Sequence, residues 1–423
     1  MEGISFMKKI FLLSLIFLLI FSNIGTALEI KEKEWREDLN YLEEELPARH
    51  KNLFFQLEKE EFKQEMSKLK NDLAKLSNLE VTLRMAEIFA EIGDTHTAID
   101  NTRFLSEYYP LFLRRFEDGY RVMTTTEQHK EILGAELISI NGYSVEELKN
   151  KFSRIITSDN QVSLNYRLSS FLKLNELLSY LEIAESENEF MFEQNEEKIS
   201  ISFEPLKIEN MAADRNTFVS LDYQPGYVLE NANQLFWSDY IAAEKILYFQ
   251  YNSCWSRELA EKHGQPNPEL PSFAAEKLEI LDLIKNEEIN KLVIDLRFNS
   301  GGDSSQGTKF AEELREYKDQ FETYVIIGPD TFSSAIINAL DFKEELNGYL
   351  IGTPTMGKPN HYGEVRTFNL PNSGLRVSYS TKYFTLLEDS DPDSLYPEIT
   401  VETRFEDFLN GRDTILEMIK NLD

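Results

Sequence analysis

The segment that most constrains the fold is residues 291–302, KLVIDLRFNSGG. Residues 292–296 are apolar except for Asp295, a run too continuous for a strand with one face in water. Such a run is typical of a strand buried on both faces, as in a parallel sheet. It leads into Asn299-Ser300-Gly301-Gly302, and adjacent glycines permit positive φ angles and can direct N–H groups at an anion. The segment therefore predicts a tight turn at the carboxyl edge of an α/β sheet, where such sheets bind ligands, or a turn with no further role.

Strand and helix patterns alternate around this segment. In chain order they are a strand at 246–251, a helix at 272–284, the segment itself, a helix that ends at Tyr317, a strand at 324–327, a helix at 335–340 and a strand at 349–351. This alternation predicts βαβ units and a mostly parallel sheet. A hairpin is predicted at 365–370 and 375–385, and a last helix has Ile415, Ile419 and Leu422 on one face.

The part of the chain before residue 101 is predicted to be mainly helical, from residue 33 to residue 92. Ser77 and Glu80 have the spacing of a capping box, which predicts the start of a helix. Gly93 is suited to end this helix. His96 therefore lies in a loop just past a helix end.

Residues 101–230 show a mixed pattern of short alternating runs. Within them, residues 134–142 predict a strand that leads into an Asn-Gly turn, and a helix is predicted at 145–152. This order resembles the later part of a PDZ domain, although no carboxylate-binding loop precedes it. The region is interpreted as a degenerate PDZ-like insert or as a hairpin and helix with no special function.

Length, charge and the N-terminus limit the class of protein. The chain has 423 residues, enough for two or three domains with ample core. Its formal net charge of −30 argues against nucleic acid or an anionic membrane as a partner, because phosphate binding needs basic patches. Lys8-Lys9, the apolar run 10–21 and the small residues 25–27 have the three parts of a secretory leader, with an uncleaved membrane anchor as the alternative. Cys254 is the only cysteine, so we expect export without disulfides.

The strand-turn-helix unit that follows the Gly-Gly turn places Ser333 and Ser334 where a helix begins. Serine at such a position is commonly an N-cap. It is also where a nucleophile sits on a strand-to-helix turn, with N–H groups ready to hold an oxyanion. Because neighbouring parallel strands end at the same edge, we expect the glycine turn to lie beside Ser333. The N–H groups of Gly301 or Gly302 and of Ser334 are then the candidate oxyanion donors.

A nucleophilic serine needs a base, and two residues are candidates. Lys358 lies in a glycine-bracketed loop directly after a predicted strand, and His96 follows the helical region. A lysine acts as a base near neutrality only after its pKa falls by about 3 units, which needs roughly 3–5 kcal/mol of desolvation or repulsion; a histidine near 6.5 needs almost no shift. His96 is the easier base if the helical domain folds back over the sheet. The sequence alone does not decide whether Lys358 or His96 is the base.

Three motifs resemble those of the tail-specific, or C-terminal processing, serine peptidase family. They are VIDLRFNSGG at 293–302, TFSSA at 331–335 and IGTPTMGK at 351–358, in the family's order. The resemblance implies a crotonase-like α/β core and hydrolysis of peptide bonds, with Ser333 as the nucleophile and Lys358 as its base. Two positions depart from that pattern: Ile336 stands where the motif has glutamate, and Tyr362 where it has glutamine.

The chain also resembles the tricorn-like branch of that family. The Gly-Asp-Thr95-His96-Thr motif matches the place of a hydroxyl residue and a histidine in that branch, and Asp391 matches an acid that precedes a terminal Pro-acid-Ile strand. This resemblance implies that Asp391 orients His96, with another acid of residues 388–393 as the alternative. The same motif occurs in the family's relatives of the retinoid-binding protein of the eye, which bind ligands without cutting peptides.

We therefore predict an exported serine endopeptidase with a polypeptide substrate, at the cell surface or secreted. No metal or organic cofactor is expected, because no cluster has ligand spacing. The expected organisation is a signal peptide at 1–27, an N-terminal helical domain at 28–100, the mixed α+β region at 101–230 and a catalytic core at 231–423. A non-catalytic binder of hydrophobic ligands and a peptide-binding surface adaptor are the two alternatives. The oligomeric state is not predicted.

Overall fold

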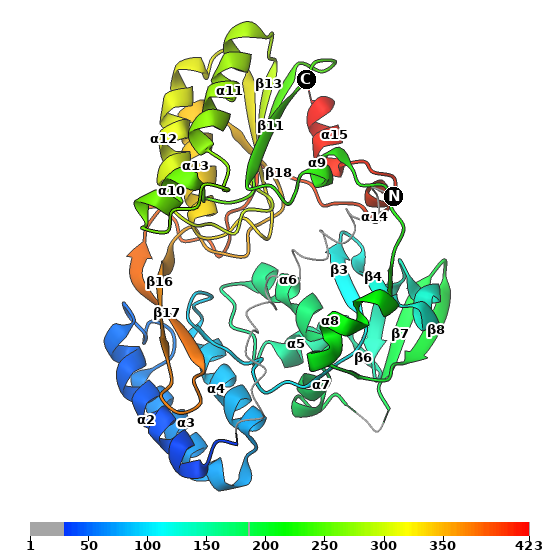
Figure 1. Cartoon of the computed structure of the whole chain (residues 1–423), viewed down its shortest axis with the longest axis vertical. Helices are drawn as coiled ribbons and strands as arrows, with labels where there is room; N and C mark the ends of the chain where they lie inside the picture. Colours follow the sequence, from blue (N-terminus) through cyan, green and yellow to red (C-terminus); the bar gives the residue numbers. More distant parts are fainter. Residues whose placement is uncertain (1–28, 185–186, 423) are drawn as a thin grey trace. The chain divides into compact units, whose positions relative to one another are not determined.

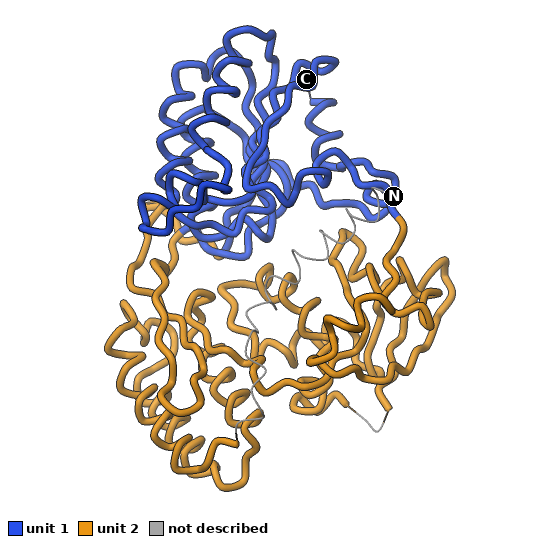
Figure 2. Tube along the Cα trace, viewed as in Figure 1, with its two compact units in different colours: residues 1–25, 223–359, 394–423 blue, residues 26–222, 360–393 orange. Residues whose placement is uncertain are grey.

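A computed structural model describes residues 29–184 and 187–422. The signal peptide predicted at 1–27 lies outside these residues. Within them, the chain forms two compact units (Figure 2): unit 1 contains residues 223–359 and 394–422, and unit 2 contains residues 29–222 and 360–393, apart from the gap. No helix in the described part of the chain combines the length and the apolar character that a membrane span needs.

Unit 1 is built on a six-stranded, mostly parallel sheet. Its strands, in spatial order, are β11 (Phe236–Ile241), β12 (Ile246–Tyr251), β13 (Lys291–Asp295), β14 (Glu322–Ile327), β15 (Tyr349–Gly352) and β18 (Ile399–Thr400). Only β11 runs antiparallel to its neighbour β12, and the other four pairings are parallel. The predicted α/β architecture with a mostly parallel sheet is thus confirmed, and β12 has the predicted bounds.

Helices cover both faces of this sheet (Figure 1). The crossovers contain α10 (Arg257–Lys262), α11 (Phe273–Asn286), α12 (Ser305–Leu314) and α13 (Ser334–Leu346), while α9 (Tyr227–Glu230), α14 (Phe405–Leu409) and α15 (Thr414–Lys420) belong to the flanking segments. Ile415 and Ile419 of α15 share a core with Val293 of β13. Phe249 of β12 meets Phe310 of α12 edge to face on the opposite side of the sheet. Burial on both faces explains why the strand in 291–302 is almost entirely apolar.

A buried ion cluster fixes α15 to the end of β13. The guanidinium of Arg297 lies 2.8 Å from Asp295 Oδ2 and 3.1 Å from Asp413 Oδ1. Asp295 also accepts a 2.6 Å hydrogen bond from the hydroxyl of Tyr248. Asp413 caps α15 by accepting the N–H of Leu416 at 2.7 Å. The cluster therefore joins the chain just before the Gly-Gly turn to the C-terminal helix.

Unit 2 contains the predicted N-terminal helices, which are α2 (Glu32–Arg49), α3 (Lys59–Asp72) and α4 (Asn78–Ile92). Ser77 and Glu80 form the expected capping box, and Gly93 ends α4 with a φ of 72°. The predicted hairpin is present as β16 (His361–Asn369) and β17 (Arg376–Phe384), with β1 (Ala98–Ile99) added to it. Asp38 of α2 accepts the N–H groups of Asn372 and Ser373 in the hairpin turn, each at 2.8 Å. The hairpin therefore belongs to the same unit as the N-terminal helices.

A seven-stranded antiparallel sheet forms the other part of unit 2. Its strands are β3 (Phe112–Phe116), β4 (Gly119–Thr126), β5 (Glu136–Ile140), β6 (Tyr143–Ser144), β7 (Glu189–Gln194), β8 (Glu197–Ser202) and β10 (Phe218–Ser220). Around it are α5 (Val145–Phe152), α6 (Gln161–Phe171), α7 (Asn175–Tyr180), α8 (Met211–Asp214) and the short pair β2 (Glu107–Tyr108) and β9 (Leu206–Lys207). The Asn-Gly turn is present, with φ angles of 50° and 78° at Asn141 and Gly142, and α5 has the predicted bounds. A PDZ-like identity for this region stays a prediction.

The Arg297 cluster generates a prediction about stability. Arg297→Met leaves the carboxylates of Asp295 and Asp413 buried without a cation, so we expect the free energy of unfolding to fall by about 3–5 kcal/mol. Urea titration followed by circular dichroism measures the change. The matched control is Arg315→Met, because the Arg315 side chain is 55% exposed where it pairs with Glu345. That variant is expected to unfold at nearly the same urea concentration as the wild type, because an exposed ion pair is screened by solvent, and equal losses in the two variants would contradict the assigned role of Arg297.

Candidate active site

Four loops meet at the carboxyl edge of the unit 1 sheet. They follow β12, β13, β14 and β15, and because these strands are parallel their ends lie at one edge. Gly302 of the second loop pairs with Cys254 of the first. The N–H of Phe332 in the third loop donates to the carbonyl of Asn299 in the second at 3.0 Å. A Cβ at Gly357 of the fourth loop would lie 2.8 Å from the ring of Phe332. The glycine turn, Ser333 and the Lys358 loop are therefore neighbours within one unit.

Ser333 has a strained backbone directly before α13. Its φ and ψ are 55° and −122°, outside the regions that L-residues ordinarily occupy, at a typical cost of about 1–3 kcal/mol. Thr331 holds the loop: its hydroxyl donates to Leu296 O at 2.9 Å and accepts from Gly328 N at 3.0 Å. The Ser333 side chain makes no capping hydrogen bond, so the plain N-cap role that the sequence also allowed is not what the structure shows. A strained serine between a strand and a helix N-terminus is the arrangement that exposes a nucleophile.

The turn beside Ser333 requires both of its glycines. Gly301 has a φ of 101°, and a Cβ there would lie 2.8 Å from Phe332 O and 3.1 Å from Ser334 N. Gly302 has a φ of 138°, and a Cβ there would collide with the carbonyl oxygen of Cys254. A side chain at Gly301 would thus push the turn away from the loop that carries Ser333, and a side chain at Gly302 would push it away from the loop that carries Cys254.

Lys358 follows Gly357 in the fourth loop and is half-buried. The loop packs on the serine loop, because a Cβ at Gly357 would also lie 3.0 Å from Ile336 Cδ1 of α13. The ammonium of Lys358 has no ion pair or hydrogen bond with the residues that the structure describes. The two members of the predicted Ser–Lys pair are therefore on adjoining loops.

His96 belongs to unit 2, in the loop that follows α4. Its side chain is buried, its Nδ1 lies 3.8 Å from Asp94 Oδ1, and its ring stacks on that of His361 with centroids 5.7 Å apart. Burial lowers the pKa of His96 to about 4; the charge of Asp94 opposes this shift, and His361 and Arg167 add to it. The imidazole is therefore neutral at pH 7 and able to accept a proton.

Asp94 and His50 were not singled out by the sequence. His50 Nε2 lies 3.0 Å from Asp94 Oδ2, and the same carboxylate accepts hydrogen bonds from the hydroxyls of Ser380, at 2.7 Å, and Thr97. Burial raises the pKa of Asp94, but the hydrogen bond from His50 and the neighbouring groups outweigh it and hold the pKa below its ordinary value. The Gly-Asp-Thr-His-Thr motif contains Asp94, so its position beside His96 was a signal that the sequence analysis did not use. No motif contains His50, which lies 44 residues earlier in the chain.

Asp391 is exposed and also belongs to unit 2. Burial raises the pKa of Tyr383, and the charge of Asp391 adds to this shift. The carboxylate that the structure places against His96 is that of Asp94. The orienting role of Asp391 stays a prediction.

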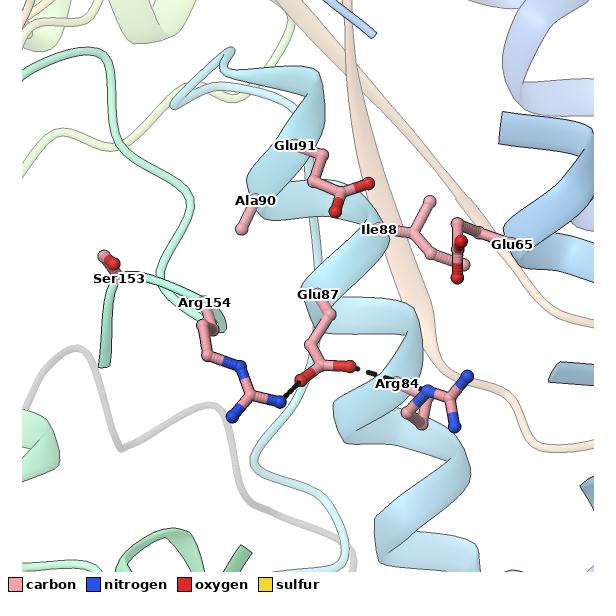
Figure 3. A pocket seen from close by; sticks show the side chains of 8 residues that line it. All are labelled: Glu65, Arg84, Glu87, Ile88, Ala90, Glu91, Ser153 and Arg154. Carbon is pink, nitrogen blue, oxygen red and sulfur yellow. Dashed lines mark hydrogen bonds and ion pairs between the residues drawn. The ribbon is translucent and has the colours of Figure 1, made fainter. Parts of the chain in front are cut away.

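Unit 2 also has a polar cavity of about 400 Å³ (Figure 3). It is lined by Glu65, Arg84, Glu87, Ile88, Ala90, Glu91, Ser153 and Arg154. Among these lining residues, Glu87 lies between two arginines, 2.6 Å from Arg154 and 3.5 Å from Arg84. None of the predicted site residues lines this cavity. Among the described residues, no group of three or more His, Cys, Asp and Glu side chains is arranged to hold a metal ion.

No protein-family model and no curated protein matches the sequence. Solved structures do match. Mature CPAF, in a complex with lactacystin, is 13% identical, with a TM-score of 0.63 over 92% of this chain and 98% of that chain. The tricorn protease is 15% identical, with a TM-score of 0.44 over 92% of this chain and 36% of that chain. The photosystem II D1 C-terminal processing protease is 13% identical, with a TM-score of 0.39 over 88% of this chain and 92% of that chain.

The chain therefore has the fold of CPAF over nearly the full length of both proteins. The other two likenesses are too distant to carry an argument.

The lowered pKa of His96 predicts how stability depends on pH. A histidine titrates near pH 6.5 in the unfolded chain and at about pH 4 in the folded protein, so the unfolded chain binds the extra proton between these values. We expect the free energy of unfolding to fall by about 2–3 kcal/mol from this group as the pH is lowered from 7 to 4.5. Urea titrations at both pH values measure the loss. His96→Gln lacks this contribution, and a pH dependence equal to that of the wild type would contradict the assignment.

Proposed function

We propose that this protein is an exported serine-type peptidase that cuts polypeptides through an acyl-enzyme on Ser333. The observation that carries the proposal is the strained backbone of Ser333 at the N-terminus of α13, packed against a turn that only two glycines can form. The fold shared with CPAF and the three sequence motifs support the same conclusion.

The proposed reaction uses Ser333 and the backbone N–H groups at the carboxyl edge of the unit 1 sheet. Ser333 Oγ attacks the scissile carbonyl carbon and loses its proton to a base, while the carbonyl oxygen becomes an oxyanion. The N–H groups of Gly302 and Ser334 stabilise this oxyanion, and a single donor of this kind is worth about 10²–10³ in rate. The base then returns the proton to the leaving amine, and water hydrolyses the ester.

Two bases fit this scheme. Lys358 is supported by its place on a loop that adjoins the Ser333 loop in the same unit. His96 is supported by its neutrality at pH 7 and by the carboxylate beside it. In the second scheme the orienting acid is Asp94 or, as the resemblance implies, Asp391.

The remaining sequence-based expectations belong to this proposal. The core of residues 231–423 is crotonase-like, and the insert of residues 101–230 is a degenerate PDZ-like region. A leader at 1–27 directs export, and the protein is secreted or held at the cell surface. Its partner is a polypeptide substrate and not a nucleic acid.

A second candidate function is a non-catalytic binder on the same fold. Ile336, which stands where the family motif has glutamate, is fully buried. It packs beside Gly357, next to Lys358, and so offers no carboxylate to the serine loop. A protein of this kind would keep the fold and lack a reactive serine.

Labelling with a fluorophosphonate distinguishes these two functions. The Ser333 Oγ–P bond forms, the P–F bond breaks and fluoride leaves, so we expect one stable label per chain, read by intact-protein mass spectrometry. Ser333→Ala should take up no label. The control Ser272→Ala removes an N-cap, whose hydroxyl accepts the N–H of Ala275 at 3.1 Å, and should lose about 1 kcal/mol of stability while still being labelled. A folded wild type that is never labelled and does not cut unfolded casein would refute the peptidase proposal.

The pH dependence of labelling identifies the base. With His96 as the base, the rate rises around pH 4 and is level from pH 6 to 8, because the imidazole is already neutral there. His96→Gln should then lose most of the rate at pH 7, and Lys358→Met should keep it. A rate that rises only above about pH 8 and disappears in Lys358→Met would exclude the histidine scheme and support the lysine.

A further inference from the structure

The backbone polar groups of the Gly301-Gly302 turn are engaged with one exception. The N–H of Gly301 donates to Asn299 Oδ1 at 2.9 Å, and its carbonyl accepts the N–H of Cys254 at 3.0 Å. The carbonyl of Gly302 accepts the hydroxyl of Ser334 at 2.7 Å, and the N–H of Asp303 donates to Cys254 O at 2.9 Å. The N–H of Gly302 has no partner among the residues that the structure describes. Gly302 is exposed, so this N–H is available to water or to a ligand.

The direction of this N–H follows from the peptide geometry. In a trans peptide the carbonyl and the N–H point in opposite directions. The carbonyl of Gly301 points at Cys254, so the N–H of Gly302 in the same peptide points away from that loop. Gly301 itself lies against the serine loop, since a Cβ on it would be 3.0 Å from Ser333 Cβ. The bonds on either side of this peptide therefore control where the one open donor points.

Asn299 is one of the side chains that make these bonds. It is fully buried, its Nδ2 donates to Tyr251 O at 2.8 Å, and its Oδ1 accepts the N–H of Gly301. Its carbonyl also accepts the N–H of Phe332, the residue before Ser333. Asn299 thus ties the end of β12, the glycine turn and the serine loop together. It also removes Gly301 from the set of oxyanion donors.

Ser334 is the other such side chain, and its role is distinct from that of its backbone. Its N–H belongs to the first turn of α13, while its hydroxyl reaches back to the carbonyl of Gly302. The hydroxyl therefore fixes the peptide that follows Gly302. The N–H of Cys254 fixes the peptide between Gly301 and Gly302, and the Asn299 side chain fixes the peptide that precedes Gly301.

We propose that the side chains of Asn299 and Ser334 are positioning residues that hold the glycine turn so that Gly302, and not Gly301, presents its N–H to the oxyanion. The inference rests on the proposed peptidase function. It assigns these two side chains to the transition state and not to binding of the substrate, because their polar atoms are engaged within the protein. Asn299 bonds to Tyr251 O and to the N–H of Gly301, and Ser334 bonds to Gly302 O.

The test compares Asn299→Ala, Ser334→Ala and Ser334→Thr with the wild type. The fluorophosphonate is the probe, because its phosphoryl oxygen takes the place of the oxyanion. In the two alanine variants we expect the maximal labelling rate to fall by about 10–10²-fold, as a displaced donor would cause, with the half-saturating probe concentration changed by less than about threefold. Ser334→Thr restores a hydroxyl and should recover most of the rate. Hydrolysis of dye-labelled casein should fall by the same factors.

A control separates positioning from a general loss of stability. Gln250→Ala removes another fully buried amide from the same sheet, one that bonds Trp237 Nε1 at 2.6 Å and Val228 O at 3.0 Å. It should lower the melting temperature as Asn299→Ala does while leaving the labelling rate of the folded protein unchanged. Alanine variants that label within twofold of the wild type, or a Ser334→Thr variant no better than Ser334→Ala, would overturn the inference while the peptidase proposal stands. A wild type that neither labels nor cuts casein would overturn both.

Discussion

The hydrogen bond between the N–H of Phe332 and the carbonyl of Asn299 is the contact on which the candidate site depends. It joins the loop after β13 to the loop after β14, so the glycine turn and Ser333 cannot move independently. The parallel sheet makes the bond possible, because β13 and β14 are neighbours whose ends emerge side by side. The strained φ of Ser333 and the positive φ angles of both glycines persist only because such bonds hold both loops in place.

Charge is distributed differently in the two units. In unit 1, Arg297 pairs with both Asp295 and Asp413 next to the glycine turn, and its guanidinium carries a permanent charge. In unit 2, a carboxylate is surrounded by histidines and hydroxyls, and His96 is kept neutral chiefly by burial. The first arrangement supports a fixed backbone geometry. The second provides a group that can change its protonation state.

Local patterns were sufficient for much of the fold. The helix at 145–152, the capping box at Ser77 and the Asn-Gly turn at 141–142 depend on contacts within a few residues, and the structure has them as predicted. The strand at 246–251 was recognised from its local run of apolar residues, although its partner β13 lies more than 40 residues later in the chain. Pairings between strands that are far apart in the chain could not be predicted from local patterns. The strand β1 has two residues and acquires its partner β17 nearly 300 positions later, since Ala98 pairs with Ser378. The sequence of a two-residue strand is too short to predict a partner strand so far away in the chain.

The candidate site divides in the same way. The sequence by itself determined the buried strand, the two glycines and the serine at a helix start, because alternating patterns and special φ angles are local properties of the chain. The tertiary structure decided that the Ser333 side chain does not cap its helix, that Asn299 occupies the N–H of Gly301, and that Asp94 lies between His50 and His96 in contact with both. These facts depend on which polar groups lie within about 3 Å of one another after folding, and pairing of that kind is set by the packing of distant segments. The residue types could be listed beforehand, but their hydrogen-bond partners could not.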